Sequence, residues 1–193
     1  MNFGFTEEQN LLKDQVQRFM KEACPMTRVR EISASENAFD KTLWQQAADL
    51  GWLGLTIPES YGGLGLKWID LVVVLEAAAE GLSPLPIATH ALATSAIVTC
   101  ASEEQKARWL PAMASGEAVV TLGLYDEANW IDPAAITARA FVAGGRVSLQ
   151  AKKPFVNDAL AADHLLLAVQ GPDGLALAAV GRDQVQVAAQ PTI

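Results

Sequence analysis

Hydrophobic positions recur every three to four residues over roughly the first 115 residues, which is the spacing of amphipathic helices. Thr6 with Gln9, and Ser102 with Gln105, have the spacing of capping boxes, in which a hydroxyl and an amide satisfy free N–H groups at a helix start. Helices are therefore expected from Thr6 to Pro25, over 41–50, 68–80 and 86–100, and again from Ser102.

After Gly116 the pattern changes to short apolar or alternating runs, separated by turn residues such as Gly-Gly and Gly-Pro-Asp-Gly. The runs cover residues 118–124, 136–143, 147–149, 164–169, 175–180 and 185–188. The predicted fold class is therefore α+β and multidomain: an N-terminal all-α helical domain over 1–116, followed by a small antiparallel β domain over 117–193. Because the last run lies so close to the end of the chain, we expect the β domain to be incomplete, or completed by a partner.

Composition narrows the function classes. The 193 residues are 51% hydrophobic, which is typical of a folded globular protein, and carry a net charge of −8. An acidic surface repels phosphate backbones, so a nucleic-acid partner is not expected. Backbone dipoles can still hold the phosphates of a bound cofactor.

The residue types that bind metals are isolated in this chain. Cys24 and Cys100 lack metal-ligand spacing and are expected to be buried, reduced thiols of a cytoplasmic protein. His90 and His164 are expected to be structural, so no metal site is predicted. Residues 81–102 carry no charge, but their prolines, hydroxyls and alanines favour a helix buried in the domain over a membrane span.

Four segments of the chain resemble acyl-CoA dehydrogenases. They are residues 5–9 (FTEEQ), 50–65 (LGWLGLTIPESYGGLG), 103–117 (EEQKARWLPAMASGE) and 153–159 (KPFVNDA), the last followed by Ala162-Asp163. The resemblance implies a helical N-terminal domain, a middle β domain and a C-terminal helical domain, with FAD between the last two. This sequence does not contain the third domain.

The resemblance also implies an activity, the α,β-dehydrogenation of an acyl-CoA thioester in fatty-acid or steroid side-chain degradation. In the family a glutamate of the C-terminal domain removes the α-proton, so no catalytic residue is expected in this chain, and the 193 residues alone are expected to be inactive. Glu76 and Glu80, one helical turn apart, are expected to form a polar helix face, and Glu59 to serve as a cap or ion-pair partner. The implied partners are an electron-transfer flavoprotein or similar acceptor and further subunits of a homo- or hetero-oligomer.

The flavin contacts implied by the resemblance fall on Leu124 and Tyr125 in one block and on Phe155, Val156 and Asn157 in another. Phe155 corresponds to the aromatic side chain that packs on the isoalloxazine ring. Tyr125 stands where the family has a threonine, and Asn157 where it has a hydroxyl residue, although an amide can also form a hydrogen bond there. The alternative is that these positions are core strand residues that touch no cofactor.

The altered flavin blocks leave two other functions open. The chain could be a non-catalytic scaffold subunit that pairs with an active dehydrogenase chain. It could also be part of a flavin-dependent oxidase or monooxygenase with the same fold.

Overall fold

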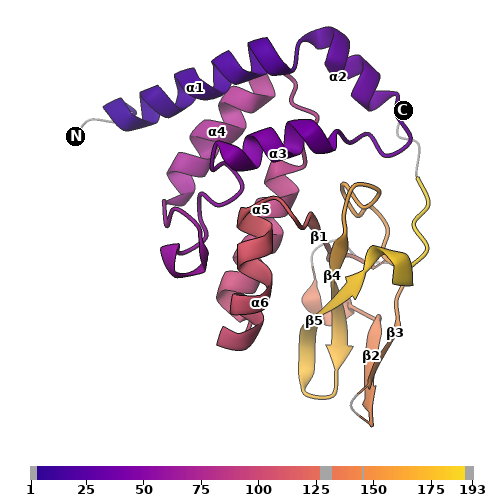
Figure 1. Cartoon of the computed structure of the whole chain (residues 1–193). Helices are drawn as coiled ribbons and strands as arrows, with labels where there is room; N and C mark the ends of the chain where they lie inside the picture. The colour runs from indigo at the N-terminus through magenta and orange to yellow at the C-terminus, as the bar shows by residue number, and fades with distance from the viewer. Residues whose placement is uncertain (1–3, 127–131, 145, 190–193) are drawn as a thin grey trace. The chain divides into compact units, whose positions relative to one another are not determined.

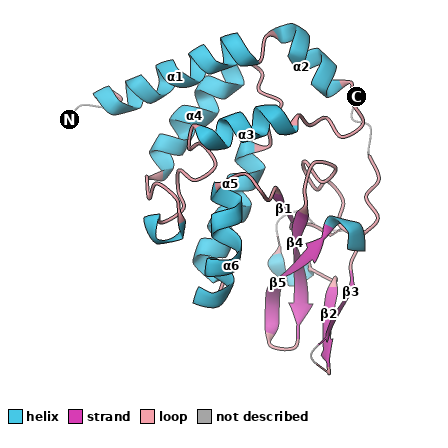
Figure 2. Ribbon diagram, viewed as in Figure 1, coloured by secondary structure: helices cyan, strands magenta, loops and turns pink. Residues whose placement is uncertain are grey.

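The computed structural model describes residues 4–126, 132–144 and 146–189 (Figure 1). The chain divides into two compact units, Met1–Ala118 and Val119–Ile193. The helices of the first unit are α1 (Glu7–Ala23), α2 (Met26–Ser33), α3 (Lys41–Asp49), α4 (Trp68–Glu80), α5 (Ile87–Cys100) and α6 (Glu103–Ala114), with a short 3₁₀ turn at Glu59–Tyr61. All strands follow residue 119 (Figure 2), so the change from α to β near Gly116 is confirmed. The exact domain bounds of 1–116 and 117–193 stay a prediction.

Both predicted capping boxes are present. The Thr6 hydroxyl accepts from the Gln9 backbone N–H at 3.2 Å, and the Gln9 amide oxygen accepts from the Thr6 N–H at 3.1 Å. Ser102 and Gln105 repeat this arrangement at the start of α6. These contacts satisfy N–H groups that an α-helix leaves free at its first turn, so they explain where α1 and α6 begin.

One helix was not predicted from the sequence. Pro25 was interpreted only as the end of the first helix, but it is also the N-cap of α2. Proline is tolerated at a helix start because the N–H that it lacks would have no intrahelical partner there. Val29 and Ile32 are the buried side chains of this eight-residue helix.

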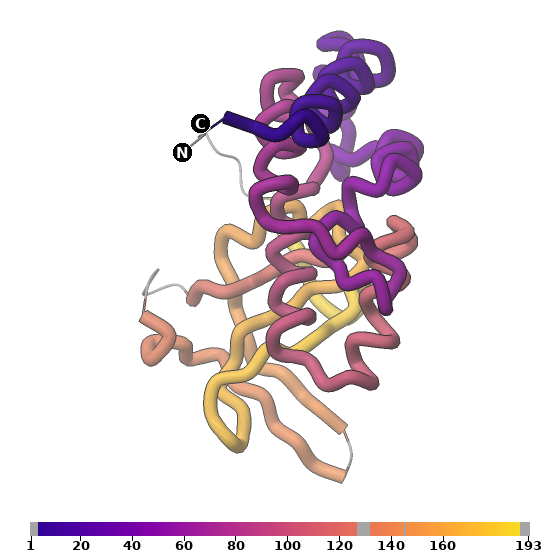
Figure 3. The backbone as a smooth tube through the Cα atoms, turned by 90° about the vertical axis from the view of Figure 1, so that its left-hand side faces the viewer, coloured from indigo at the N-terminus to yellow at the C-terminus, as the bar shows by residue number. Residues whose placement is uncertain are grey.

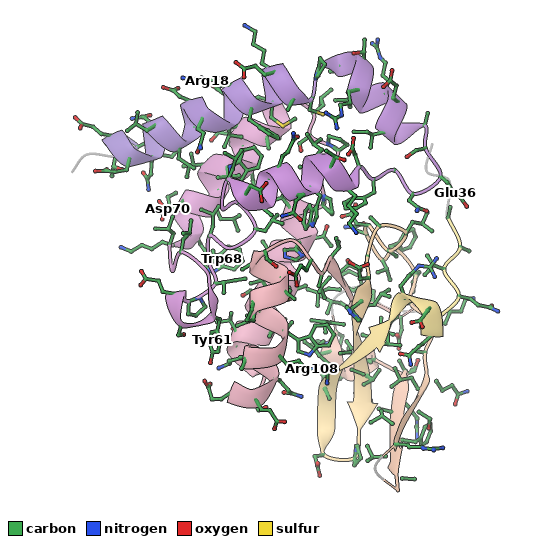
Figure 4. All side chains as sticks on the ribbon, viewed as in Figure 1. Arg18, Glu36, Tyr61, Trp68, Asp70 and Arg108 are labelled. Atoms are coloured by element: carbon green, nitrogen blue, oxygen red, sulfur yellow. The ribbon has the colours of Figure 1, made fainter. Side chains whose placement is uncertain are left out.

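Ion pairs join α1 to α4. Lys13 Nζ lies 3.4 Å from a Glu76 oxygen and 3.3 Å from a Glu80 oxygen. The Gln9 amide of α1 also donates to Asp70 at the start of α4 (2.9 Å; Figure 4). The prediction that Glu76 and Glu80 form a polar helix face is therefore confirmed.

The uncharged helix α5 is largely buried. His90, Ala91, Ala93, Thr94 and Ile97 all have less than a tenth of their surface exposed. Within the described part of the chain, no helix is long and apolar enough to cross a membrane. The two thiols differ from the prediction: both are free, and Cys24 is buried, but Cys100 is exposed because it is the last residue of α5.

The glycine-rich loop after α3 folds back on itself. Gly65 N–H donates to the Ile57 carbonyl oxygen at 2.8 Å, and Leu66 N–H to the Leu55 oxygen at 2.7 Å. Gly62 adopts a left-handed conformation (φ +84°), while a Cβ on Gly63 would lie 2.1 Å from the Ile57 oxygen. Glycine is therefore required at both positions, for backbone conformation at one and for close approach at the other.

The second unit contains one five-stranded sheet. Its strands are β1 (Val120–Gly123), β2 (Arg139–Ala143), β3 (Arg146–Gln150), β4 (His164–Gly171) and β5 (Gly174–Gly181). The strand order is β1-β4-β2-β3, with β5 also paired to β4, and Figure 3 shows β2–β3 and β4–β5 as two hairpins. On one face Leu165, Leu167 and Val169 of β4 form the centre of a core cluster.

Two β predictions were wrong. The sheet is mixed, because β4 runs parallel to β1 and pairs in parallel with β2 through Arg139 and Gln170, whereas a purely antiparallel sheet was expected. Apolar alternation reports which face of a strand is buried but not the direction of its partner. The run 185–188 is not a strand: Val185 and Val187 pack against the core cluster without joining the ladder.

Candidate functional site

Two segments of the β unit that lie far apart in sequence come together in the structure. Lys153 Nζ donates to the Leu124 carbonyl oxygen at 3.4 Å, and the Thr121 hydroxyl donates to the Asn157 carbonyl oxygen at 2.7 Å. Between these contacts the segments approach closely at Gly123, where an added Cβ would lie 3.2 Å from Val156 Cγ2. The structure therefore brings together the two blocks that contain all five predicted flavin contacts.

The five side chains are not equivalent. Leu124, Tyr125 and Phe155 are 38%, 41% and 52% exposed, so they contribute apolar surface to this part of the β unit. Asn157 is exposed, whereas Val156 is half-buried and packs against the core cluster. Val156 therefore fits the alternative of a core residue, whereas the other four side chains are exposed. Residues 127–131, which complete the first block, lie outside the described part of the chain.

A buried ion pair fastens the two segments. Lys153 Nζ lies 2.6 Å from Asp126 Oδ1, and the two side chains are only 4% and 7% exposed. The other carboxylate oxygen, Oδ2, accepts from the Thr137 N–H (2.5 Å), the Thr137 hydroxyl (2.9 Å) and the Ala138 N–H (2.9 Å). Both oxygens of Asp126 are thus fully engaged within the protein.

These contacts determine the ionisation of Asp126. Burial by itself raises the pKa of the carboxyl, but hydrogen bonds from Lys153, Ala138 and Thr137 outweigh it and lower the pKa to about 2. The carboxylate therefore stays ionised at neutral pH and forms a neutral pair with the lysine. Because neither group is offered to a substrate, the pair is suited to hold structure rather than to transfer protons.

Sequence analysis did not single out this pair. Asp126 follows the predicted contact Tyr125 directly, and Lys153 opens the second block two residues before Phe155. The sequence does contain a signal for this pair: one acidic and one basic residue stand at the edges of two segments that are expected to meet. Opposite charges that are buried together must pair, because an isolated buried charge is strongly unfavourable.

The backbone at Phe155 is left-handed, with φ +54°. Only a few per cent of non-glycine residues adopt such a conformation, which costs roughly 1–2 kcal/mol. Strained residues of this kind persist where the surrounding contacts hold them, and they concentrate at binding sites. Phe155 lies between the two fastened residues of its segment, Lys153 and Asn157.

His90, which was expected to be structural, can also be placed. His90 is buried, its Nε2 donates to the Met113 carbonyl oxygen at 3.2 Å, and its ring packs edge-on against Trp44 at 5.1 Å. Its role in the fold is therefore structural, as predicted. The described residues contain no group of three His, Cys, Asp or Glu side chains that could hold a metal ion.

Comparison with known proteins identifies the family. A family model described as "Acyl-CoA dehydrogenase, N-terminal domain" matches residues 6–117, more than half of the chain. The chain belongs to the acyl-CoA dehydrogenase family. Among curated relatives, it is 31% identical to mitochondrial isovaleryl-CoA dehydrogenase of Pongo abelii over 169 residues, which cover 85% of this chain and 40% of that protein.

Two solved structures share the fold of this chain. A variant of the Tcur3481–Tcur3483 steroid ACAD is 30% identical with a TM-score of 0.81, and the match covers 92% of this chain and 48% of that one. The ChsE4–ChsE5 complex from Mycobacterium tuberculosis is 26% identical with a TM-score of 0.82, covering 94% and 49%. The present chain therefore spans about half or less of the length of the family members that it matches.

Proposed function

We propose that this chain supplies the helical and β domains of an FAD-dependent acyl-CoA dehydrogenase, whose catalytic base lies outside these 193 residues. The observation that carries the proposal is the meeting of the segments 124–126 and 153–157 in a member of this family. They present half-exposed apolar and aromatic side chains beside a pair of charges that neutralise each other. Apolar and aromatic side chains of this kind suit contact with the flat, largely apolar ring of a flavin.

In this proposal Phe155 and Tyr125 contact the flavin ring, and the Asn157 amide forms a hydrogen bond to it. Bound FAD supplies the hydride acceptor for the oxidation of the acyl chain. This chain's own residues orient the ring and keep water from one side of it, since Leu124, Tyr125 and Phe155 present apolar surface there. Removal of the substrate α-proton then falls to a group elsewhere in the complete protein. The acyl-CoA substrate, an electron-transfer flavoprotein as acceptor and an oligomeric assembly belong to the same proposal.

A second candidate is a scaffold subunit that pairs with an active dehydrogenase chain. Two observations favour it. Tyr125 replaces the threonine, and Asn157 the hydroxyl residue, that the family uses at the flavin, and the chain is similar to the ChsE4–ChsE5 complex, which is named for two components. A larger tyrosine in place of threonine would narrow the space for the ring.

Purification of the polypeptide that carries this sequence, at its natural length, distinguishes the two candidates. We expect about one FAD per chain by visible absorption, and enoyl-CoA formation from an acyl-CoA when an electron acceptor is present. Phe155→Ala should weaken FAD binding about tenfold, because a stacked aromatic side chain is lost. Phe141→Ala is the matched control, since Phe141 is also half-exposed (50%) but lies on β2. Colourless protein that gains activity only with a second chain would favour the scaffold.

A further inference from the structure

The buried pair of Asp126 and Lys153 has no part in the chemistry described above, yet it lies at the edge of the proposed flavin site. It joins residues that are 27 positions apart in the chain, and Lys153 Nζ reaches both the Asp126 carboxylate and the Leu124 carbonyl oxygen. These two contacts hold the lysine side chain in place. They therefore fix the first residue of the segment 153–157.

A second contact fixes the other end of that segment. The Thr121 side chain, on a residue only 1% exposed, donates to the Asn157 carbonyl oxygen at 2.7 Å. Phe155 lies midway between Lys153 and Asn157, with its backbone left-handed and its side chain half-exposed. These two contacts fix both ends of the segment in which Phe155 has a left-handed backbone, and such a conformation persists only where surrounding contacts support it.

We infer that Asp126 and Lys153 are positioning residues for the flavin: their buried pair, with the Thr121 contact, holds Phe155 in its strained conformation and its ring ready for stacking. This inference rests on the proposed function, because it concerns FAD binding. Holding the ring before the ligand arrives lowers the ordering cost of binding. Loss of the pair should then weaken FAD binding even where the fold is retained.

A positioning role and a purely structural role of this pair predict different results for single and double variants. Removal of a single partner leaves an uncompensated buried charge and destabilises the fold, whereas removal of both charges can leave stability almost unchanged. Lys153→Met and Asp126→Asn should each lower both the stability and the FAD affinity. The double variant should regain the stability but not the affinity. A merely structural pair would give a double variant in which both recover.

The test measures the FAD dissociation constant, by flavin fluorescence, and the denaturation midpoint of the natural-length protein and its variants. We expect the double variant to bind FAD about tenfold more weakly than the wild type, with a midpoint close to the wild-type value. Without FAD, amide exchange in residues 153–158 should be faster in the double variant. Arg146→Met is the control, because this variant also removes one positive charge from the second unit, at an exposed position on β3. It should leave the FAD dissociation constant unchanged.

The possible results distinguish a failure of the proposed function from a failure of this assignment. A wild-type protein that binds no FAD overturns the proposed function and this assignment with it. A double variant that binds FAD as tightly as the wild type overturns the assignment alone, as does an equal loss in Arg146→Met. If the double variant does not fold, Thr137→Val removes only the side-chain donor to Asp126 Oδ2 and should raise the dissociation constant about threefold. An unchanged value in that variant also overturns the assignment.

Discussion

His90 makes the stability of the helical unit depend on pH in a window that can be predicted. Its side chain is 1% exposed, and burial lowers the pKa to about 4, although the hydrogen bond to the Met113 carbonyl opposes this shift. The ordinary value of 6.5 applies to the unfolded chain. Between these two values the unfolded chain binds a proton that the folded chain does not.

The sign and size of the effect follow by linkage. The stability is complete above pH 6.5, falls as the pH drops toward 4, and changes no further through His90 below that pH. One pKa unit corresponds to about 1.4 kcal/mol, so the loss amounts to about 2 kcal/mol at pH 5 and about 3 kcal/mol below pH 4. Asp126 does not interfere with this measurement, because its pKa of about 2 places the stability change that it causes at a more acidic pH.

The perturbation that isolates the histidine is His90→Gln. The glutamine amide can donate to the Met113 carbonyl oxygen but does not bind a proton. Urea unfolding at pH 7 and pH 5, followed by tryptophan fluorescence, gives the unfolding free energy of both proteins, and Trp44 lies close enough to report on the site (5.1 Å). The wild type should lose about 2 kcal/mol more than His90→Gln over this interval.

The comparison uses the change with pH rather than the absolute stability, since glutamine packs differently from histidine. All other ionisable groups are the same in both proteins, so their contributions cancel. Equal pH dependence in the wild type and His90→Gln would refute the reasoning, because a buried neutral histidine must contribute a slope in this range.

Two further predictions concern the helical unit, and both are checked by urea denaturation. Gly63→Ala should destabilise it by more than about 3 kcal/mol, because the new Cβ would lie 2.1 Å from the Ile57 backbone oxygen. Gly62→Ala, which meets no atom within 4 Å, should cost only the roughly 1–2 kcal/mol of its left-handed backbone, and similar losses for the two variants would contradict this account. Trp44→Phe should cost about 1–3 kcal/mol, because its Nε1 donates to the Gly116 carbonyl oxygen at 3.1 Å in a buried setting; a smaller effect would mean that water replaces the donor.

The helices of the first unit were predictable because their signals are local. The Thr6–Gln9 and Ser102–Gln105 capping boxes lie within four residues of sequence, and each satisfies N–H groups of its own helix. The missed helix α2 marks the limit of such signals, since Pro25 both ends one helix and begins the next. A proline can end a helix with or without starting another, and here the packing of Val29 and Ile32 stabilises a second helix.

Family motifs in the sequence located the two blocks of the candidate site, but not what holds them. Nothing local relates Asp126 to Lys153, and their pairing follows only from the fold that buries both. The left-handed backbone of Phe155 likewise depends on contacts at both ends of its segment. Neither feature has a periodicity or turn signature that could be read along the chain.

The sequence by itself determined where the helices begin, where α changes to β, which residues are apolar on one face, and the family. Each of these depends on interactions between near neighbours or on motifs. Only the tertiary structure decided that β4 runs parallel to β1, that 185–188 packs without pairing, and that Asp126 and Lys153 meet. The physical reason is that strand direction and buried charge pairing are set by contacts between distant segments, which hydrophobic patterning does not specify.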